Sequence, residues 1–174
     1  MGRAAVVALH VAVCGPRECT DAEAALARRV GELLAARQAV VICGGGGGVM
    51  AAVAAGVRAR DGLVIGIRPG DGSDGADGAD GGDEASPDLS ATIVTNMGEA
   101  RNAIIVQSAD AVISVGGSWG TLSEVALAVR RGGIPVIALG GGWRVVDADG
   151  VAVPGIDQAD TPEEAVGKAM AGRG

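Results

Sequence analysis

Short apolar runs alternate with longer amphipathic segments along this chain. The apolar runs predict β-strands over residues 4–13, 39–43, 63–67, 91–94, 111–115 and 135–139. The amphipathic segments predict helices over residues 20–37, 49–60, 98–108, 120–131 and 161–171. Apolar strands alternating with helices are typical of βαβ units, whose parallel sheet is covered on both faces. Because such crossovers are right-handed, the pattern predicts one doubly wound, Rossmann-like α/β domain, a three-layer αβα arrangement over residues 1–174.

Two of the predicted helices begin with a recognisable cap. The sequence T-x-x-E at Thr20, and again at Thr161, fits a capping box, in which the two side chains accept hydrogen bonds from each other's backbone N–H groups. The same spacing recurs at Thr121 and Glu124, so a third capping box is one interpretation of that segment.

Glycines gather where the predicted strands end. Ligands of doubly wound sheets bind beyond the carboxyl ends of the strands. In this chain those ends carry residues 15–16, 44–48, 95–98 and 116–120, most of them rich in glycine. This clustering at one sheet edge is the strongest indication of a binding site from the residues alone.

The first candidate site is a run of five glycines between a strand and a helix. Glycines in this position let backbone N–H groups approach an anion at a helix N-terminus. The candidate phosphate-binding residues are Gly44, Gly45, Gly46, Gly47 and Gly48, with Met50 just inside the helix. No acidic residue ends the next strand and no Lys-Ser/Thr follows, so neither the dinucleotide fingerprint nor the P-loop applies. The alternative is a tight packing loop.

The second candidate site also joins a strand to a helix. Its predicted ligand-binding residues are Gly117, Ser118, Trp119, Gly120 and Thr121, which offer backbone and hydroxyl donors. Glu124 is expected one helical turn further on, on the same face as Thr121. The glycines before this segment and its place on the ligand edge favour a site over a simple cap.

Arg101 is the third candidate. It lies near the start of a predicted helix, where its charge opposes the helix dipole. It therefore needs an anionic partner, and Glu124, Asp110 or a bound phosphate are the candidates. A surface salt bridge is the alternative.

Composition narrows the classes of function. The chain has 31 glycines without a Gly-X-Y period, two tryptophans, and no tyrosine or phenylalanine, so its core is aliphatic and a stacking platform for single-stranded nucleic acid is excluded. Seven of the 21 acidic residues fall within residues 71–88, which we interpret as a disordered acidic insertion, with a lid over the site as the alternative. The remainder carries 14 acids and 14 bases, so no nucleic-acid-binding face is predicted.

The cysteines indicate a reduced, cytoplasmic protein. There are three, an odd number, with no C-x-x-C pair and no cluster with histidine, so no metal site is predicted. Cys14 and Cys43 are expected to pack in the core, as is His10 in the middle of the first strand. The longest uncharged run, residues 38–57, contains five consecutive glycines, so a membrane span is not expected.

Three motifs in order carry a resemblance to a known family. The segments CGGGGGVMAAVAAGV, NMGEARNAIIVQSADAVISVGG and SWGTLSEVALAV resemble the LOG-like superfamily, long labelled "possible lysine decarboxylase". The superfamily includes cytokinin-activating phosphoribohydrolases and molybdenum cofactor carrier proteins. The resemblance covers about residues 4–142 and implies a Rossmann-like fold and a homodimer or homotetramer.

The resemblance also implies roles for individual residues. The phosphoribohydrolase signature, a helical Arg followed by PGGxGTxxE, falls on Arg101 and Glu124, the implied catalytic pair on a nucleoside 5′-monophosphate. The family's Asp falls on Asp110. The implied phosphate ligands are residues 45–48 and 117–121. A carboxylate in this position can stabilise the positive charge that develops on the ribose and orient a water.

A second function remains open within the same resemblance. The chain has Gly116-Gly117-Ser118 in place of PGG and Arg101-Asn102 in place of Arg-Lys, and its phrases GGVM and GEARN are closer to a bacterial branch of the superfamily and to the molybdenum cofactor carriers. A carrier binds a pterin phosphate without hydrolysing it. The expected ligand is thus a nucleoside monophosphate or molybdenum cofactor, with no further cofactor required. Lysine decarboxylation is excluded, because the single lysine, Lys168, lies in the C-terminal helix, far along the chain from the glycine loops.

Overall fold

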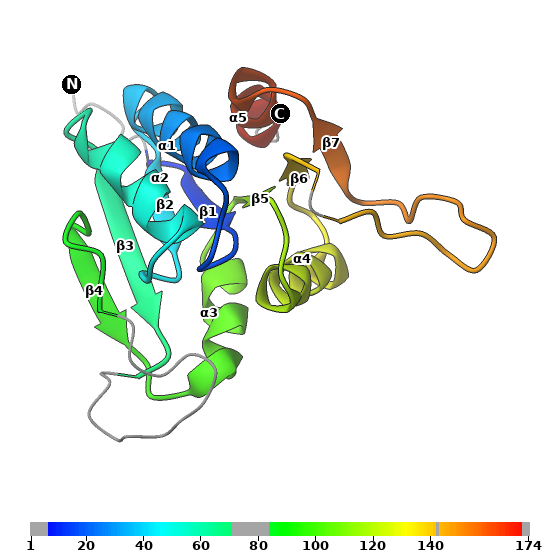
Figure 1. The fold of residues 1–174 in the computed structure, drawn as a ribbon, viewed down its shortest axis with the longest axis horizontal. Helices are drawn as coiled ribbons and strands as arrows, with labels where there is room; N and C mark the ends of the chain where they lie inside the picture. The colour runs from blue at the N-terminus through cyan, green and yellow to red at the C-terminus, as the bar shows by residue number, and fades with distance from the viewer. Residues whose placement is uncertain (1–6, 71–83, 142, 172–174) are drawn as a thin grey trace, which may run out of the picture.

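The computed structural model describes residues 7–70, 84–141 and 143–171, which form a seven-stranded sheet flanked by helices (Figure 1). The strands are β1 (His10–Cys14), β2 (Val40–Cys43), β3 (Leu63–Arg68), β4 (Ala91–Val94), β5 (Ala111–Val115), β6 (Val136–Leu139) and β7 (Asp157–Ala159). The helices are α1 (Asp21–Ala36), α2 (Val49–Arg58), α3 (Arg101–Gln107), α4 (Trp119–Arg131) and α5 (Pro162–Ala171), with a 3₁₀ turn η1 (Gly98–Ala100) before α3. All neighbouring strands are parallel, in the order β4-β3-β2-β1-β5-β6-β7.

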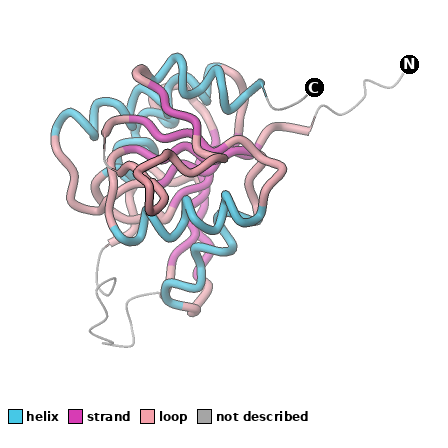
Figure 2. The backbone as a smooth tube through the Cα atoms, turned by 90° about the vertical axis from the view of Figure 1, so that its right-hand side faces the viewer, coloured by secondary structure: helices cyan, strands magenta, loops and turns pink. Residues whose placement is uncertain are grey.

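Helices cover both faces of the sheet, which confirms the Rossmann-like α/β class (Figure 2). One apolar cluster joins the strands to α1, α2 and α5, and a second joins them to α3 and α4. Val11 and Val13 of β1 point into the first cluster while Ala12 and Cys14 point into the second. This alternation follows from the two-residue period of a strand, and it explains why the central strands are largely apolar on both faces.

Helices α1 and α2 pack unusually closely through two glycines. A Cβ added to Gly31 of α1 would lie well under 3.0 Å from the backbone carbonyl oxygen of Val53. A Cβ added to Gly56 of α2 would lie equally close to the carbonyl oxygen of Arg28. Real Cβ atoms essentially never approach so closely, so the absence of a side chain sets the spacing between these helices.

The predicted elements and the structure differ mainly at the ends of the chain. The pattern missed β7, because this edge strand is three residues long and its first two positions are exposed and polar. Strand β1 is shorter than predicted and begins at His10, which is therefore at the strand's start rather than in its middle and only half-buried. The cap at Thr20 is confirmed as a capping box, and Thr161 accepts a hydrogen bond from the Glu164 backbone.

The acidic insertion falls partly within the described residues. Residues 71–83 lie outside them. The remainder differs from the expected disorder, because Ser86 is buried and its N–H donates to the Gly45 carbonyl at 3.0 Å. Leu89 packs against the first apolar cluster. The end of the insertion therefore covers the glycine loop.

A long connection between β6 and β7 extends away from the body of the domain and appears orange in Figure 1. Its two arms meet in an isolated antiparallel bridge between Val146 and Ala152. Within the described part of the chain, no helix has the length and apolar character needed to cross a bilayer.

Candidate functional site

A cavity of about 520 Å³ lies at the carboxyl edge of the sheet. The cavity lies where the strand order reverses. Strands β2, β3 and β4 lie on one side of β1, and β5, β6 and β7 lie on its other side. Such a switch point is where open α/β sheets bind ligands. The lining residues come from the segment after β1, the start of α2, the start of α3 and the start of α4: Cys14, Gly15, Pro16, Arg17, Glu18, Gly44, Met50, Glu99, Arg101, Asn102, Gly117, Ser118, Trp119, Gly120, Thr121 and Glu124.

Of the five-glycine loop, only Gly44 belongs to this lining. Gly44 and Met50 line the cavity, and a Cβ on Gly44 would collide with the Arg101 guanidinium. Gly45 packs instead against Gly66 of β3, 3.1 Å from where its Cβ would lie. Gly48 has a φ of 58° and lies directly against the backbone of residues 16–17. Gly46 is buried and Gly47 is half-buried. The loop thus packs tightly and leaves room for an arginine at the cavity.

The second glycine segment forms the N-terminus of α4 and faces the cavity with all five predicted residues. The N-cap is Ser118, whose Oγ accepts from the Thr121 N–H at 3.2 Å. The interpretation of Thr121 and Glu124 as a capping box is therefore wrong, because both lie inside the helix. The N–H groups of the first turn, at Trp119 and Gly120, have no acceptor within the helix and can donate hydrogen bonds to a bound anion.

Arg101 and Glu124 line the same cavity, as their predicted pairing requires. Both are more than nine-tenths buried. Arg101 Nη1 donates to the carbonyl oxygen of Ile67 at 3.2 Å, while its Nε is buried without a hydrogen-bond partner among the described residues. An unpaired donor on a buried cation is costly, so this guanidinium has unused capacity for an acceptor.

Two buried cysteines lie beneath the charged pair. Burial, and then the neighbouring Glu124 carboxylate, raise the pKa of the Cys14 thiol well above its ordinary value. The protonated thiol therefore donates its hydrogen bond to Glu124. Burial also raises the pKa of Cys43 to about 11, despite the opposing Arg101 charge. Both thiols stay neutral at pH 7, so neither is a nucleophile or a thiolate ligand there.

Asp110, in contrast, lies at the opposite edge of the sheet. It precedes β5, and its Oδ2 accepts from the His10 N–H at 2.9 Å, at the start of β1. The adjacent His10 ring is 3.2 Å from the Ser108 carbonyl oxygen. The candidate pairing of Asp110 with Arg101 is therefore wrong, because the length of the strands separates them.

Several lining residues were not predicted. Cys14 is the last residue of β1, and Arg17 and Glu18 follow it within four residues, so their place on the ligand edge was the signal that could have found them. Glu99 and Asn102 lie in the GEARN segment with Arg101, but no role was predicted for them. The wall carries two arginines and three glutamates, so the cavity has mixed charge rather than a strongly basic surface.

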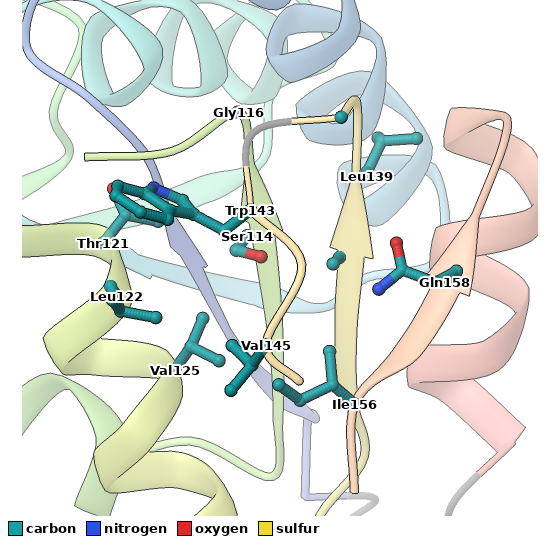
Figure 3. Close-up of a pocket in the computed structure, with 12 residues that line it drawn as sticks. Ser114, Gly116, Thr121, Leu122, Val125, Leu139, Trp143, Val145, Ile156 and Gln158 are labelled. Atoms are coloured by element: carbon teal, nitrogen blue, oxygen red, sulfur yellow. The ribbon is translucent and has the colours of Figure 1, made fainter. Parts of the chain in front are cut away.

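A much smaller cavity, of about 20 Å³, lies behind α4 (Figure 3). It has room for about one water. Trp143, from the connection after β6, closes it and reaches toward Thr121 at the start of α4. The Trp143 and Trp119 rings are 5.1 Å apart between centroids and tilted by 50°. Among the described residues, no group of three or more His, Cys, Asp or Glu side chains could hold a metal ion.

The comparison with known proteins assigns the family. The sequence matches the SLOG cluster 4 family over residues 8–166. The chain belongs to this family. This match confirms the resemblance to the LOG-like superfamily.

The similarity to individual relatives covers nearly the whole of this chain. A protein of Archaeoglobus fulgidus is 41% identical over 160 residues, covering 91% of this chain and 92% of its own. The solved structure of the molybdenum cofactor binding protein from the phototrophic bacterium Rippkaea orientalis is 31% identical, with a TM-score of 0.78 and coverage of 94% and 96%. The molybdenum cofactor carrier protein of Chlamydomonas reinhardtii, at 24% identity, shares the fold, with a TM-score of 0.74 and coverage of 92% and 95%.

Proposed function

We propose that this protein binds a phosphorylated heterocycle of the molybdenum cofactor type in the 520 Å³ cavity and holds it without chemical change. The observation that carries the proposal is the buried cation of Arg101, which lines a cavity that the start of α4 also lines. A phosphate would supply the anionic partner of the guanidinium, and the N–H groups at the start of α4 favour the same charge. The similarity to the Rippkaea orientalis protein supports the cofactor class.

The size and shape of the site are consistent with such a ligand. Cavities that enclose small ligands usually measure about 300–1,000 Å³. The phosphate would contact Gly117, Ser118, Gly120 and Thr121, whose backbone and hydroxyl groups surround the start of α4. In this proposal Gly45–Gly48 have a packing role, and Gly44 makes space for Arg101.

Recovery of bound cofactor tests the proposal. The protein is purified from a host that makes molybdenum cofactor, and molybdenum and oxidised pterin are measured per protein chain. We expect near-stoichiometric amounts for the wild type and a marked loss for Arg101→Gln, because charge-assisted hydrogen bonds contribute about 1.5–3 kcal/mol, or roughly 10- to 150-fold in affinity.

Arg68→Gln is the matched control. Arg68 is also about nine-tenths buried and also donates to a backbone carbonyl, that of Gly45, but it does not line the cavity. Thermal unfolding of both variants separates loss of binding from loss of folding. A wild-type protein that carries neither molybdenum nor pterin, or equal loss in both variants, contradicts the proposal.

A phosphoribohydrolase is the second candidate, and one observation favours it. Arg101 and Glu124 line one cavity, with Cys14 donating a hydrogen bond to Glu124 and so orienting its carboxylate. The test incubates the protein with AMP, CMP, GMP and UMP and measures free base by chromatography. Base release that disappears in Glu124→Gln supports the hydrolase, whereas ligand recovered intact supports the carrier.

A further inference from the structure

We propose that Trp119 stacks on the flat, fused ring system of the ligand, and that Trp143 holds the Trp119 indole in position for this contact. The inference rests on the proposed function, which it extends by assigning the cavity mouth to the heterocycle rather than to the phosphate. The ligand class is a phosphorylated purine or pterin, since both present the conjugated face that an indole binds.

The distribution of aromatic residues is the first observation. The whole chain has two tryptophans and no tyrosine or phenylalanine. Both apolar clusters are built from aliphatic residues, cysteine and methionine. The two tryptophans come from different segments, yet their ring centroids are 5.1 Å apart beside the ligand cavity. Core packing therefore does not explain why the only aromatic side chains in the protein meet there.

The exposure of Trp119 is the second observation. Its side chain is 77% exposed although it lines the cavity. An indole in water leaves a large apolar surface unburied, which contact with a ligand ring would remove from solvent. Trp119 is also the first residue of α4, directly after the Ser118 cap. Its backbone is thus held by the helix next to the N–H groups proposed to bind the phosphate.

The position of Trp143 is the third observation. A Cβ on Gly117 would collide with the Trp143 indole, so the glycine leaves room for that ring directly against the backbone before α4. Figure 3 shows Trp143 lying across this end of α4 from the far side of the small cavity. The two rings are tilted by 50°, so Trp143 does not lie flat over Trp119, which stays largely exposed and lines the cavity. A ring supported in this way loses little freedom when a ligand binds.

Calorimetric titration tests the stacking contact. The probes are GMP, a pterin phosphate and ribose 5-phosphate, which keeps the phosphate but has no fused ring. We expect Trp119→Ala to weaken GMP and the pterin phosphate by about 5- to 150-fold, the range for loss of one base–aromatic stack. Trp119→Phe keeps an aromatic face and should stay within a few-fold of wild type. Ribose 5-phosphate should bind equally to all three proteins.

Tryptophan fluorescence gives a second readout. Trp143→Phe leaves Trp119 as the only tryptophan, and the chain has no tyrosine to interfere. Adding GMP should quench this emission, while ribose 5-phosphate should not. In Trp119→Phe the remaining Trp143 emission should change little with either probe. Because Trp119 is exposed, its variants should unfold at the wild-type temperature.

The outcomes separate the two proposals. If wild-type protein binds GMP or the pterin phosphate but Trp119→Ala binds it equally well, the stacking inference is overturned and the proposed function stands. Equal weakening of ribose 5-phosphate and of the ring-containing probes also overturns the inference, since it would mean that Trp119 shapes the phosphate site. If Trp119→Ala changes the sedimentation coefficient but no affinity, Trp119 is a contact between copies and the inference fails. Absence of any binding to wild type overturns both.

Discussion

Replacing Gly56 of α2 by alanine is expected to destabilise the protein, although alanine is the better helix former. The new Cβ would collide with the backbone carbonyl of Arg28 in α1. Because the obstacle is main chain rather than the end of a flexible side chain, the two helices must move apart. That movement would loosen the contacts of Val30 and Leu34 with Val53, all of them fully buried.

The magnitude follows from two opposing terms. Alanine gains about 1 kcal/mol over glycine in a helix interior, whereas overpacking costs about 1–3 kcal/mol and more when only backbone can yield. We place Gly56→Ala at the upper end of that cost and expect a net loss of about 2 kcal/mol. For a protein of this size, the unfolding temperature would fall by about 4–8 °C.

Gly167 provides a matched control in α5. A Cβ there would meet nothing within 4 Å, so only the gain in helix propensity remains. Gly167→Ala should stabilise the protein by up to about 1 kcal/mol and raise the unfolding temperature by about 2–4 °C. Both variants are measured by thermal unfolding and by urea titration, followed by circular dichroism. A shift of the same sign in both would refute the reasoning that Gly56 is required by close helix packing.

Three further predictions concern the site and its surroundings. The folded pKa of Cys43 is raised to about 11 from an ordinary 9.0, so between these pH values the unfolded thiol ionises and the folded one does not; Cys43 should therefore lower the free energy of unfolding by about 1.4 kcal/mol per pH unit there, and Cys43→Ala should reduce the slope seen in urea titrations by that amount. The Cys14 thiol, whose pKa is also raised well above 9.0, adds a slope of the same sign that Cys43→Ala leaves in place, and a slope in the variant equal to that of wild type would contradict the assignment. Ser118→Ala and Thr20→Ala each remove an N-cap and should each cost about 1 kcal/mol in chemical unfolding, but only Ser118→Ala should also weaken ligand binding, since only Ser118 lines the cavity. Gly44→Ala should displace the Arg101 guanidinium and lower cofactor retention with little change in unfolding temperature; retention equal to wild type would show that Gly44 does not control that side chain.

The elements predicted from the pattern agree well where burial dominates. Strands β2 and β6 are apolar throughout, and β5 is apolar except at Ser114, because both of their faces are covered; this makes their sequence signal strong. Strand β7 carries no such signal, since Asp157 and Gln158 are exposed and its pairing with β6 alone defines it. An edge strand of this kind is identified by its neighbour rather than by its own residues.

The candidate site was predicted in part, for a related reason. The placement of glycines at strand ends, and of Arg101 and Glu124 beside them, could be inferred because parallel strands bring their carboxyl ends to one edge. The role of each glycine could not. Gly44 clears space for Arg101, Gly45 packs on β3, and Gly48 contacts the segment after β1. These contacts join residues that are distant in the chain.

The sequence by itself determined the class of fold and brought the candidate site residues to one edge of the sheet, because these depend on local periodicity and on the order of strands and helices. Only the tertiary structure decided that Asp110 lies at the far edge, that Ser118 rather than Thr121 caps α4, and that Trp119 meets Trp143. Such pairings depend on strand register, helix packing and the path of long connections. None of these has a period in the sequence, so each is decided by which side chains the folded chain brings within contact distance.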